Sequence, residues 1–282
     1  MAEPQAVPRK QVLVIDDDPS IHDLVTLALR KAADVATSTT ATEGLMILEE
    51  RPFDLLLLDL GLPDIHGLEV LSRLRQGGSR TRVAVITADD TPESLLRAIR
   101  ENTYEYLRKP FTMEQIAQLA ERAFTTASEP EIKVLCAKRE WLELSIPCTR
   151  DAAERIEHFV RHLGSDLSLD LQGPVALAFR ELLMNAVEWG GGLDPQRRVR
   201  ISCLRTPRML LYRIADPGPG FKFEGLTHAA VANPDGVFGA SSVRQEKGIR
   251  PGGLGVLMVR EVADDLIYNE AQNEVVLVKY LS

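Results

Sequence analysis

Residues 53–67, FDLLLLDLGLPDIHG, constrain the fold of this chain more than any other segment. Four consecutive leucines before Asp59 have no polar face, so they predict a short strand buried on both sides of a sheet. Gly61 and Pro63 then end the strand in a loop. A carboxylate directly after a buried parallel strand lies at the sheet edge where such folds bind ligands. A lone aspartate at the end of a strand is more often an ordinary solvated residue than a functional one.

Apolar segments alternate with segments of helical periodicity through the first half of the chain. The predicted strands are residues 11–15, 34–36, the leucine segment, 82–87 and 104–108. The first predicted helix begins at Pro19, and four more helices are predicted at about residues 42–49, 66–75, 92–101 and 113–124. This alternation predicts an α/β fold with a doubly wound, five-stranded parallel sheet.

Polar residues follow the predicted strands where each one ends. They are Asp16 and Asp17 after the first strand, Asp59 after the third, Thr87 at the end of the fourth and Lys109 after the fifth. The carboxyl ends of parallel strands share one edge, so we expect these side chains to gather there. Three crowded carboxylates need a cation, and hard oxygen ligands in an open site suit Mg²⁺. The chemistry that fits is phosphoryl transfer to Asp59, with Thr87 and Lys109 holding phosphate oxygens. A structural ion-pair cluster is the alternative.

Residues 10–126 resemble the receiver domain of two-component response regulators. The motifs VLVIDDD, LLLLDLGLPDIHG, VAVITA and YLRKPF carry the resemblance, in this order. It implies a flavodoxin-like receiver and an upstream histidine kinase or phosphotransfer protein as partner. It also implies that Asp59 is the phosphoacceptor and that Thr87 and Lys109 sense the phosphoryl group.

The same resemblance implies a magnesium site and a switch residue. Asp16, Asp17, Asp59 and the carbonyl oxygen of Gly61 would bind Mg²⁺, and Tyr106 stands at the aromatic position that couples to the threonine. The chain departs from the family at residues 102–103, where Asn-Thr replaces a common Gly-Ala pair. This departure leaves the predicted chemistry intact but bears on the shape of the switch surface.

The domain boundary is predicted at the polar segment 127–131, ASEPE. We expect a disordered lead-in over residues 1–9, a receiver over 10–126, a linker over 127–137 and a second domain over 138–282. In the second domain, strands are predicted at about residues 140–146, 199–204, 209–215, 266–269 and 274–281. Helices are predicted at about residues 149–163, 172–188 and 256–264.

Three motifs in the second half are individually weak but suggestive in this order. They are Glu181 and Asn185 at an i, i+4 spacing; Asp216, Gly218 and Gly220 in ADPGPGF; and Gly252, Gly253 and Gly255 at the start of a helix. A chelating helix face, a carboxylate beside glycines and a glycine-rich helix start are parts of a nucleotide pocket. Neither GxxxxGK[ST] nor a Rossmann GxGxxG motif is present.

Residues from about 138 to 282 resemble the GHKL, or Bergerat-fold, ATPases, and among them the anti-sigma-factor serine kinases. The resemblance implies an α/β sandwich with a mixed, largely antiparallel sheet, and ATP with Mg²⁺ as cofactors. Asn185 would hold Mg²⁺, Glu181 would act as base, and Asp216 would accept a hydrogen bond from the adenine amino group. The glycines at 218 and 220 would line the adenine, and those at 252, 253 and 255 would close on the phosphates. Trp189 departs from the family, which often has histidine there.

Charge and composition narrow the function further. The net charge of −8 and the lack of a helix-turn-helix pattern argue against direct DNA binding. No apolar run reaches the roughly 20 residues of a membrane span. Cysteines 136, 148 and 203 have no metal-site spacing and predict a cytoplasmic context. A hybrid histidine kinase is disfavoured because His158 lacks the sequence context of a phosphoacceptor histidine.

The sequence therefore predicts a response regulator whose phosphorylation at Asp59 controls an ATP-dependent serine/threonine kinase of anti-sigma type. The partner of the kinase would be an anti-sigma-factor antagonist or a sigma factor, and the resemblance allows a homodimer. The alternative is a non-catalytic, nucleotide-binding module that sequesters a sigma factor or an antagonist by partner switching.

Overall fold

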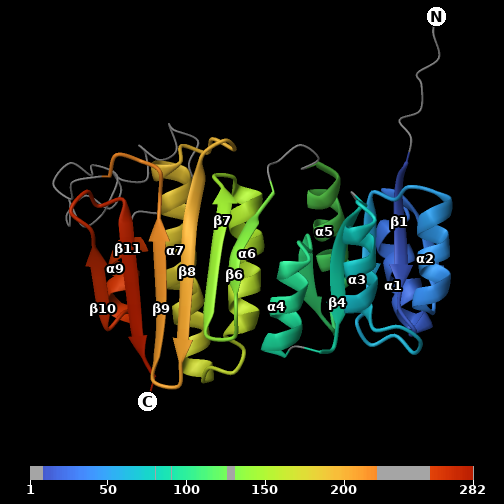
Figure 1. Cartoon of the computed structure of the whole chain (residues 1–282), viewed down its shortest axis with the longest axis horizontal. Helices are drawn as coiled ribbons and strands as arrows, with labels where there is room; N and C mark the ends of the chain where they lie inside the picture. Colours follow the sequence, from blue (N-terminus) through green and yellow to red (C-terminus); the bar gives the residue numbers. More distant parts are fainter. Residues whose placement is uncertain (1–8, 80, 90, 126–130, 221–254, 282) are drawn as a thin grey trace, which may run out of the picture. The chain divides into compact units, whose positions relative to one another are not determined.

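The computed structural model of the 282-residue chain describes residues 9–79, 81–89, 91–125, 131–220 and 255–281 (Figure 1). These residues fall into two compact units, Met1–Ser128 and Glu129–Ser282. No helix in the described ranges is long and apolar enough to cross a membrane.

Unit 1 is built on a five-stranded parallel sheet with the strand order β2-β1-β3-β4-β5. Its strands are β1 (Lys10–Ile15), β2 (Ala33–Ser38), β3 (Leu55–Leu58), β4 (Arg82–Thr87) and β5 (Glu105–Arg108). Its helices are α1 (Pro19–Leu29), α2 (Ala41–Glu50), α3 (Gly67–Gln76), α4 (Pro92–Arg100) and α5 (Met113–Thr125). The predicted doubly wound α/β fold is confirmed, and the observed strands match the predicted ones to within a few residues.

The leucine strand β3 is the central strand of this sheet, between β1 and β4. Leu55 and Leu57 pack with residues of α1 and α5 on one face. Leu56 and Leu58, which alternate with them, are also completely buried, so the other face is covered too. Double coverage explains why the sequence of β3 has no polar face, and it brings Asp59 out at the carboxyl edge of the sheet.

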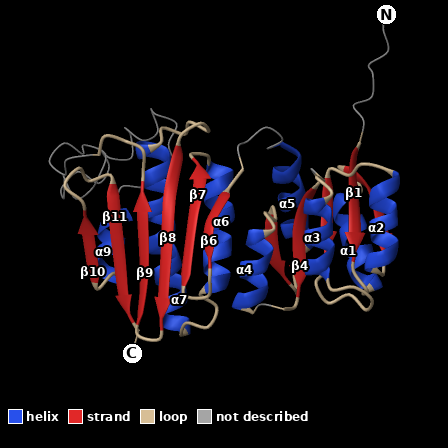
Figure 2. Ribbon diagram, viewed as in Figure 1, coloured by secondary structure: helices blue, strands red, loops and turns tan. Residues whose placement is uncertain are grey.

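Unit 2 is built on a six-stranded sheet with the order β10-β11-β9-β8-β7-β6, and all its described pairings are antiparallel. Its strands are β6 (Lys133–Ala137), β7 (Trp141–Pro147), β8 (Arg198–Thr206), β9 (Met209–Ala215), β10 (Asp265–Tyr268) and β11 (Glu274–Tyr280). Helices α6 (Arg150–Leu163), α7 (Leu169–Asn185) and α9 (Gly255–Val262) lie on one face (Figure 2). Unit 2 is therefore an α/β sandwich with a largely antiparallel sheet, as predicted.

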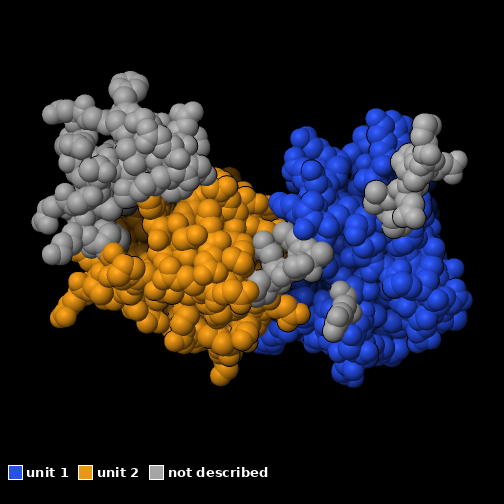
Figure 3. Space-filling model, turned by 90° about the horizontal axis from the view of Figure 1, so that it is seen from above, with its two compact units in different colours: residues 1–128 blue, residues 129–282 orange. Residues whose placement is uncertain are grey.

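Two predicted segments have different bounds in the structure. The predicted linker 127–137 is wrong over its last part, because β6 pairs with β7 and belongs to the sheet of unit 2 (Figure 3 colours the two units). The predicted helix 172–188 begins at Leu169 and changes after Asn185 into a π-helical turn, η1 (Ala186–Gly190). Wider turns of this kind are frequent at functional sites.

Candidate functional site

The acidic residues at the carboxyl edge of unit 1 form one cluster. Oxygen atoms of Asp16, Asp17 and Asp59 all lie within 4.8 Å of one another. Asp16 is completely buried and Asp59 is buried, whereas Asp17 is exposed, so the cluster opens to solvent on one side. Burial raises the pKa of Asp16 above its ordinary value, against the opposing effects of Lys109 and of the Asp18 N–H group. An open set of hard oxygen donors of this kind fits Mg²⁺.

Lys109 lies between the two buried carboxylates. Its Nζ atom is 2.6 Å from Oδ2 of Asp16 and 3.1 Å from Oδ2 of Asp59. Burial alone would lower the pKa of Lys109, but the two carboxylates outweigh this effect and raise it above its ordinary value. The ammonium group is therefore a fixed positive charge at the place where Asp59 would receive a phosphoryl group.

The loop after β3 holds the backbone around Asp59. Oδ1 of Asp59 accepts a hydrogen bond of 2.7 Å from the N–H group of Leu60. Gly67 closes the loop by donating from its N–H group to the carbonyl oxygen of Leu60, at 3.0 Å. A Cβ atom on Gly67 would lie 2.2 Å from the carbonyl oxygen of Asp59, so only glycine fits there. At Gly61 an added Cβ atom would make only an ordinary contact with the carboxylate, 3.7 Å from Oδ2 of Asp59.

Asp64, in the same loop, was not identified from the sequence. Its two oxygens accept hydrogen bonds of 2.9 Å from the N–H groups of Ala41 and Thr42. It therefore ties the loop to the N-terminus of α2. These bonds hold the pKa of Asp64 well below its ordinary value, the bond from the Thr42 hydroxyl being the largest cause. The pairing spans more than twenty residues, and no local pattern could have revealed it.

The predicted switch residues lie on neighbouring strands. Thr87 is buried at the end of β4, and its Oγ1 atom accepts a hydrogen bond of 3.2 Å from the N–H group of Asp89. Tyr106 is buried on β5, and its hydroxyl group donates to the carbonyl oxygen of Asp89. Both side chains thus contact the backbone of one residue, and a movement of the loop at Asp89 would affect both.

In unit 2, Asp216 follows β9 and is only partly exposed. Its Oδ1 atom accepts a hydrogen bond of 2.7 Å from the N–H group of Gly218. Its own N–H group donates to the carbonyl oxygen of Asn273, at 2.9 Å, and the Asn273 amide donates to the carbonyl oxygen of Gly218, at 3.0 Å. Burial raises the pKa of Asp216, while the Gly218 N–H group and the charge of Arg197 oppose this rise. The carboxylate is thus fixed in one orientation.

Gly190 lies at the candidate site, although no motif in the sequence pointed to it. A Cβ atom on Gly190 would lie 2.1 Å from Cγ of Asp216, and one on Gly218 would lie 2.9 Å from the carbonyl oxygen of Gly190. The backbone at the end of the π-helical turn therefore packs directly against the carboxylate of Asp216, which lies in the loop after β9. The run of three glycines at 190–192 was the available signal.

The other predicted nucleotide residues are placed as follows. Glu181 and Asn185 are half-buried on the last turns of α7. A Cβ atom on Gly255, the first residue of α9, would lie 2.2 Å from Oε2 of Glu181, so this glutamate reaches the start of α9. The structure thus brings Glu181 to Gly255 and Gly190 to Asp216, while Gly252 and Gly253 lie outside the described residues.

Gly220 has a close contact of its own. Its φ angle is +81°, and a Cβ atom there would lie 1.5 Å from the carbonyl oxygen of Ala271 in the turn between β10 and β11. Glycine is required for both reasons. This position supports the loop after β9, a role that the sequence reasoning did not assign.

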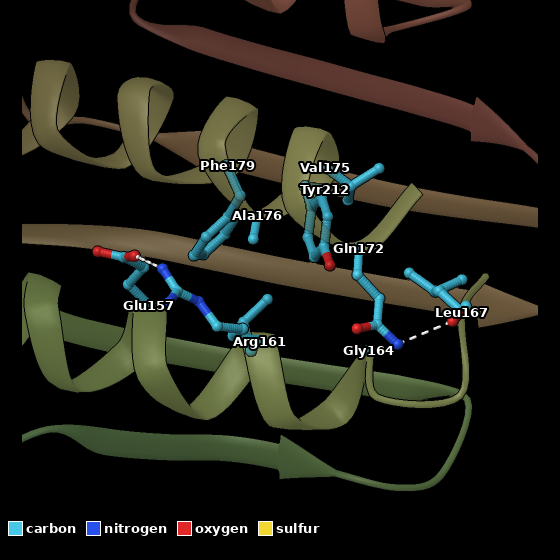
Figure 4. Close-up of a pocket in the computed structure, with 10 residues that line it drawn as sticks. Glu157, Arg161, Gly164, Leu167, Gln172, Val175, Ala176, Phe179 and Tyr212 are labelled. Carbon is cyan, nitrogen blue, oxygen red and sulfur yellow. Dashed lines mark hydrogen bonds and ion pairs between the residues drawn. The ribbon is translucent and has the colours of Figure 1, made fainter. Parts of the chain in front are cut away.

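A small apolar pocket lies elsewhere in unit 2, between α6, the first half of α7 and β9 (Figure 4). Phe179 and Tyr212 form part of its wall, with ring centroids 4.8 Å apart. Glu157 at its edge pairs with Arg161 and, at 3.0 Å, with Arg180. None of the predicted site residues lines this pocket.

Each of the two units matches the model of one protein family. Residues 12–121 match the response regulator receiver domain, and residues 146–279 match the histidine kinase-like ATPase domain. The chain therefore joins a receiver domain to a histidine kinase-like ATPase domain in one polypeptide.

Several curated regulatory proteins are similar to part of the chain. The response regulator protein PilR of Pseudomonas aeruginosa is 31% identical over 116 residues, which are 41% of this chain and 26% of PilR. The DNA-binding transcriptional regulator NtrC of Azospirillum brasilense is 27% identical over 202 residues, 71% of this chain and 42% of NtrC. The transcriptional regulatory protein KdpE of Mycobacterium tuberculosis is 37% identical over 128 residues, 44% of this chain and 56% of KdpE. The chain thus spans less than two thirds of each relative.

Solved receiver structures are similar to part of the chain. The CheY-like receiver domain protein of Methanospirillum hungatei is 26% identical to the matched part of this chain, with a TM-score of 0.40. The match covers 42% of this chain and 95% of the Methanospirillum protein. The response regulator DrrB of Thermotoga maritima is 26% identical, with a TM-score of 0.39. The match covers 42% of this chain and 53% of DrrB.

Proposed function

We propose that this protein is a response regulator in which phosphorylation of Asp59 controls an ATP-dependent serine/threonine kinase of anti-sigma type. An upstream histidine kinase or phosphotransfer protein would supply the phosphoryl group to Asp59. The kinase domain would act on an anti-sigma-factor antagonist, or sequester a sigma factor, in the cytoplasm and without direct DNA binding.

The single observation that best supports phosphorylation at Asp59 is the position of Lys109. One ammonium group pairs with both Asp16 and Asp59, beside the third carboxylate of Asp17. A structural ion-pair cluster would have no need for an exposed third carboxylate at the same point. An acceptor site needs this arrangement, because it must bind a cation and a phosphoryl group together.

The chemical step is a displacement at phosphorus. A carboxylate oxygen of Asp59 attacks the phosphorus of a phosphohistidine, a P–O bond forms, and the P–N bond breaks with its electron pair going to the imidazole nitrogen. Asp16, Asp17, Asp59 and the Gly61 carbonyl would hold Mg²⁺, which would neutralise charge on the phosphoryl oxygens. Lys109 would pair with one of these oxygens, and the Thr87 hydroxyl would bind another.

The nucleotide site of unit 2 is supported by two close approaches. Gly190 and Gly218 leave space for the Asp216 carboxylate, and Gly255 leaves space for Glu181. Asp216 thus lies against Gly190 at the end of the π-helical turn η1, which continues from the helix that carries Asn185, and this proximity supports the proposed site. In the proposed reaction Asp216 accepts a hydrogen bond from the adenine amino group. Glu181 takes the proton of the acceptor serine while the serine oxygen attacks the γ-phosphorus. The bond between the γ-phosphorus and the oxygen that bridges to the β-phosphate then breaks, and ADP leaves.

The close contact of Glu181 with Gly255 also favours the alternative, a non-catalytic partner-switching module. A glutamate packed against the start of α9 can link nucleotide binding to the position of that helix without moving a proton. The two functions differ at this residue. Glu181→Gln removes the base but keeps the shape and a hydrogen-bonding group, so a kinase would lose phosphoryl transfer, whereas a switching module would keep its effect on the partner.

The acceptor function is tested with a small-molecule phosphodonor. The protein is incubated with acetyl phosphate and Mg²⁺, and the acid-labile phosphoprotein is separated by phosphate-affinity electrophoresis. We expect wild-type protein to be modified and Asp59→Asn to remain unmodified. Asp54→Asn is the matched control, because Asp54 lies at the other end of β3, where it pairs with Lys10 at 2.9 Å. Equal labelling of wild type and Asp59→Asn would refute the assignment.

The output function is tested first by calorimetric titration with Mg-ATP, with and without beryllofluoride as a mimic of phospho-Asp59. We expect ATP to bind and the mimic to change its affinity. Transfer of the γ-phosphoryl group to a candidate antagonist is then measured for wild type and Glu181→Gln. Tight ATP binding without transfer to any antagonist would exclude the kinase and leave the switching module.

A further inference from the structure

Arg197 connects the two loops that surround Asp216. It lies just before β8, and its guanidinium group donates from Nη2 to the carbonyl oxygen of Pro217, at 2.6 Å. Its Nη1 atom donates to the carbonyl oxygen of Gly191, at 3.4 Å. The planar fork of arginine is suited to such a bridge, since it presents several donors in one rigid group.

The two bridged loops are the ones that hold the carboxylate. Gly191 follows Gly190, whose backbone contacts the Asp216 side chain, and Pro217 follows Asp216 itself. A change in the separation of these loops would therefore move the carboxylate or open the space beside it.

The backbone of Arg197 is itself anchored. Its N–H group donates to the carbonyl oxygen of Asp194, at 3.0 Å, and its carbonyl oxygen accepts from the N–H group of Cys148, also at 3.0 Å. Cys148 is completely buried at the end of β7, so the bridge starts from the core of the unit. The side chain thus acts from a fixed base.

Charge adds to the geometry. Burial raises the pKa of Asp216, and the positive charge of Arg197 opposes the rise. A hydrogen bond from a base amino group needs a carboxylate oxygen as acceptor, and Arg197 favours the ionised form that supplies it.

We propose that Arg197 is a positioning residue for nucleotide-base recognition, which holds the Gly190 loop and the Asp216 loop at the separation that selects a base with an exocyclic amino group. The proposal rests on the nucleotide site proposed above. Arg197 does not touch the nucleotide in this scheme; it acts through Asp216.

The test compares ATP with ITP, which has a carbonyl oxygen in place of the adenine amino group and gives Asp216 nothing to accept. Affinities of the full-length protein for Mg-ATP and Mg-ITP are measured by calorimetry. We expect wild type to prefer ATP by a factor of about ten or more, the usual weight of a hydrogen bond to a charged group. Arg197→Ala should reduce this preference to about threefold or less, mainly through weaker ATP binding.

Two further variants separate positioning from general structural damage. Arg197→Lys keeps the charge but cannot bridge both carbonyl oxygens as a fork, so it should recover part of the ATP preference. Arg200→Ala is the matched control, because Arg200 is exposed on β8 and pairs with Glu143 at 2.8 Å. It should leave both affinities unchanged.

The outcomes distinguish the two proposals. If wild type prefers ATP and Arg197→Ala loses the preference while still binding ITP, the inference is supported. If Arg197→Ala weakens both nucleotides equally, or changes neither, the inference is wrong while the nucleotide site stands. If wild type binds neither nucleotide, the proposed nucleotide site fails and the inference fails with it.

Discussion

Gly190→Ala is the substitution that most directly tests the nucleotide site. Its Cβ atom would lie 2.1 Å from Cγ and 2.2 Å from Oδ1 of Asp216. An ordinary contact begins near 3.4 Å, so the carboxylate has to retreat by roughly 1.3 Å, the difference between 3.4 and 2.1 Å. A hydrogen bond lengthened by this amount is no longer one.

The magnitude follows from the bond that is lost. A hydrogen bond to a charged group contributes about 1.5–3 kcal/mol, so Gly190→Ala should weaken ATP binding by about 10- to 150-fold. The φ angle of Gly190 is not among the positive ones, so backbone strain adds nothing. The free energy of unfolding should fall by about 1.5–3 kcal/mol, because the displaced carboxylate also loses its bond from the Gly218 N–H group.

The assay is calorimetric titration with Mg-ATP, together with urea unfolding of the same preparations. Gly192→Ala is the control on the same loop, since a Cβ atom there meets nothing within 4 Å but the φ angle is +68°. It should lower stability by about 1–2 kcal/mol and leave ATP affinity unchanged. A folded Gly190→Ala protein that binds ATP within threefold of wild type would refute the placement of the base at Asp216.

Three further predictions concern stability. Lys109→Met leaves the buried carboxylates of Asp16 and Asp59 without their shared cation, and should lower the unfolding free energy of the receiver by about 3 kcal/mol in urea titrations without Mg²⁺; a deficit that saturating Mg²⁺ does not reduce would contradict a cation site. Gly220→Ala should destabilise the ATPase domain by about 2–4 kcal/mol, because the added atom meets the Ala271 carbonyl oxygen at a φ angle of +81°; a wild-type melting temperature would overturn this. Burial raises the pKa of Tyr212 in the folded protein, so its phenol costs nothing below about pH 10 and destabilises the fold as the pH rises above the unfolded pKa. Tyr212→Phe should therefore match wild type at pH 7 and unfold less readily above about pH 10, and identical pH profiles would argue against this burial.

The candidate sites were recoverable from sequence to different degrees. In the receiver, each of Asp16, Asp59, Thr87 and Lys109 stands at a strand end, and parallel strands bring such ends to one edge. The strand pattern alone was therefore sufficient to gather them. In unit 2 the motif residues lie on one helix, in a loop and at the start of another helix. The order of the strands does not predict the distances between these segments. Asp216, Glu181, Gly218 and Gly255 were identified through motifs, but Gly190, whose backbone packs against the Asp216 carboxylate, was not.

Sequence by itself determined the elements of this protein and the edge at which the receiver residues collect. Periodicity records which side of each segment is buried, and this property is local. Tertiary structure alone decided that Gly190 contacts Asp216, that Arg197 bridges two loops, and that α7 continues into a π-helical turn. Such contacts depend on how far apart packed elements stand, to within about an ångström, and no periodic pattern along the chain carries that distance.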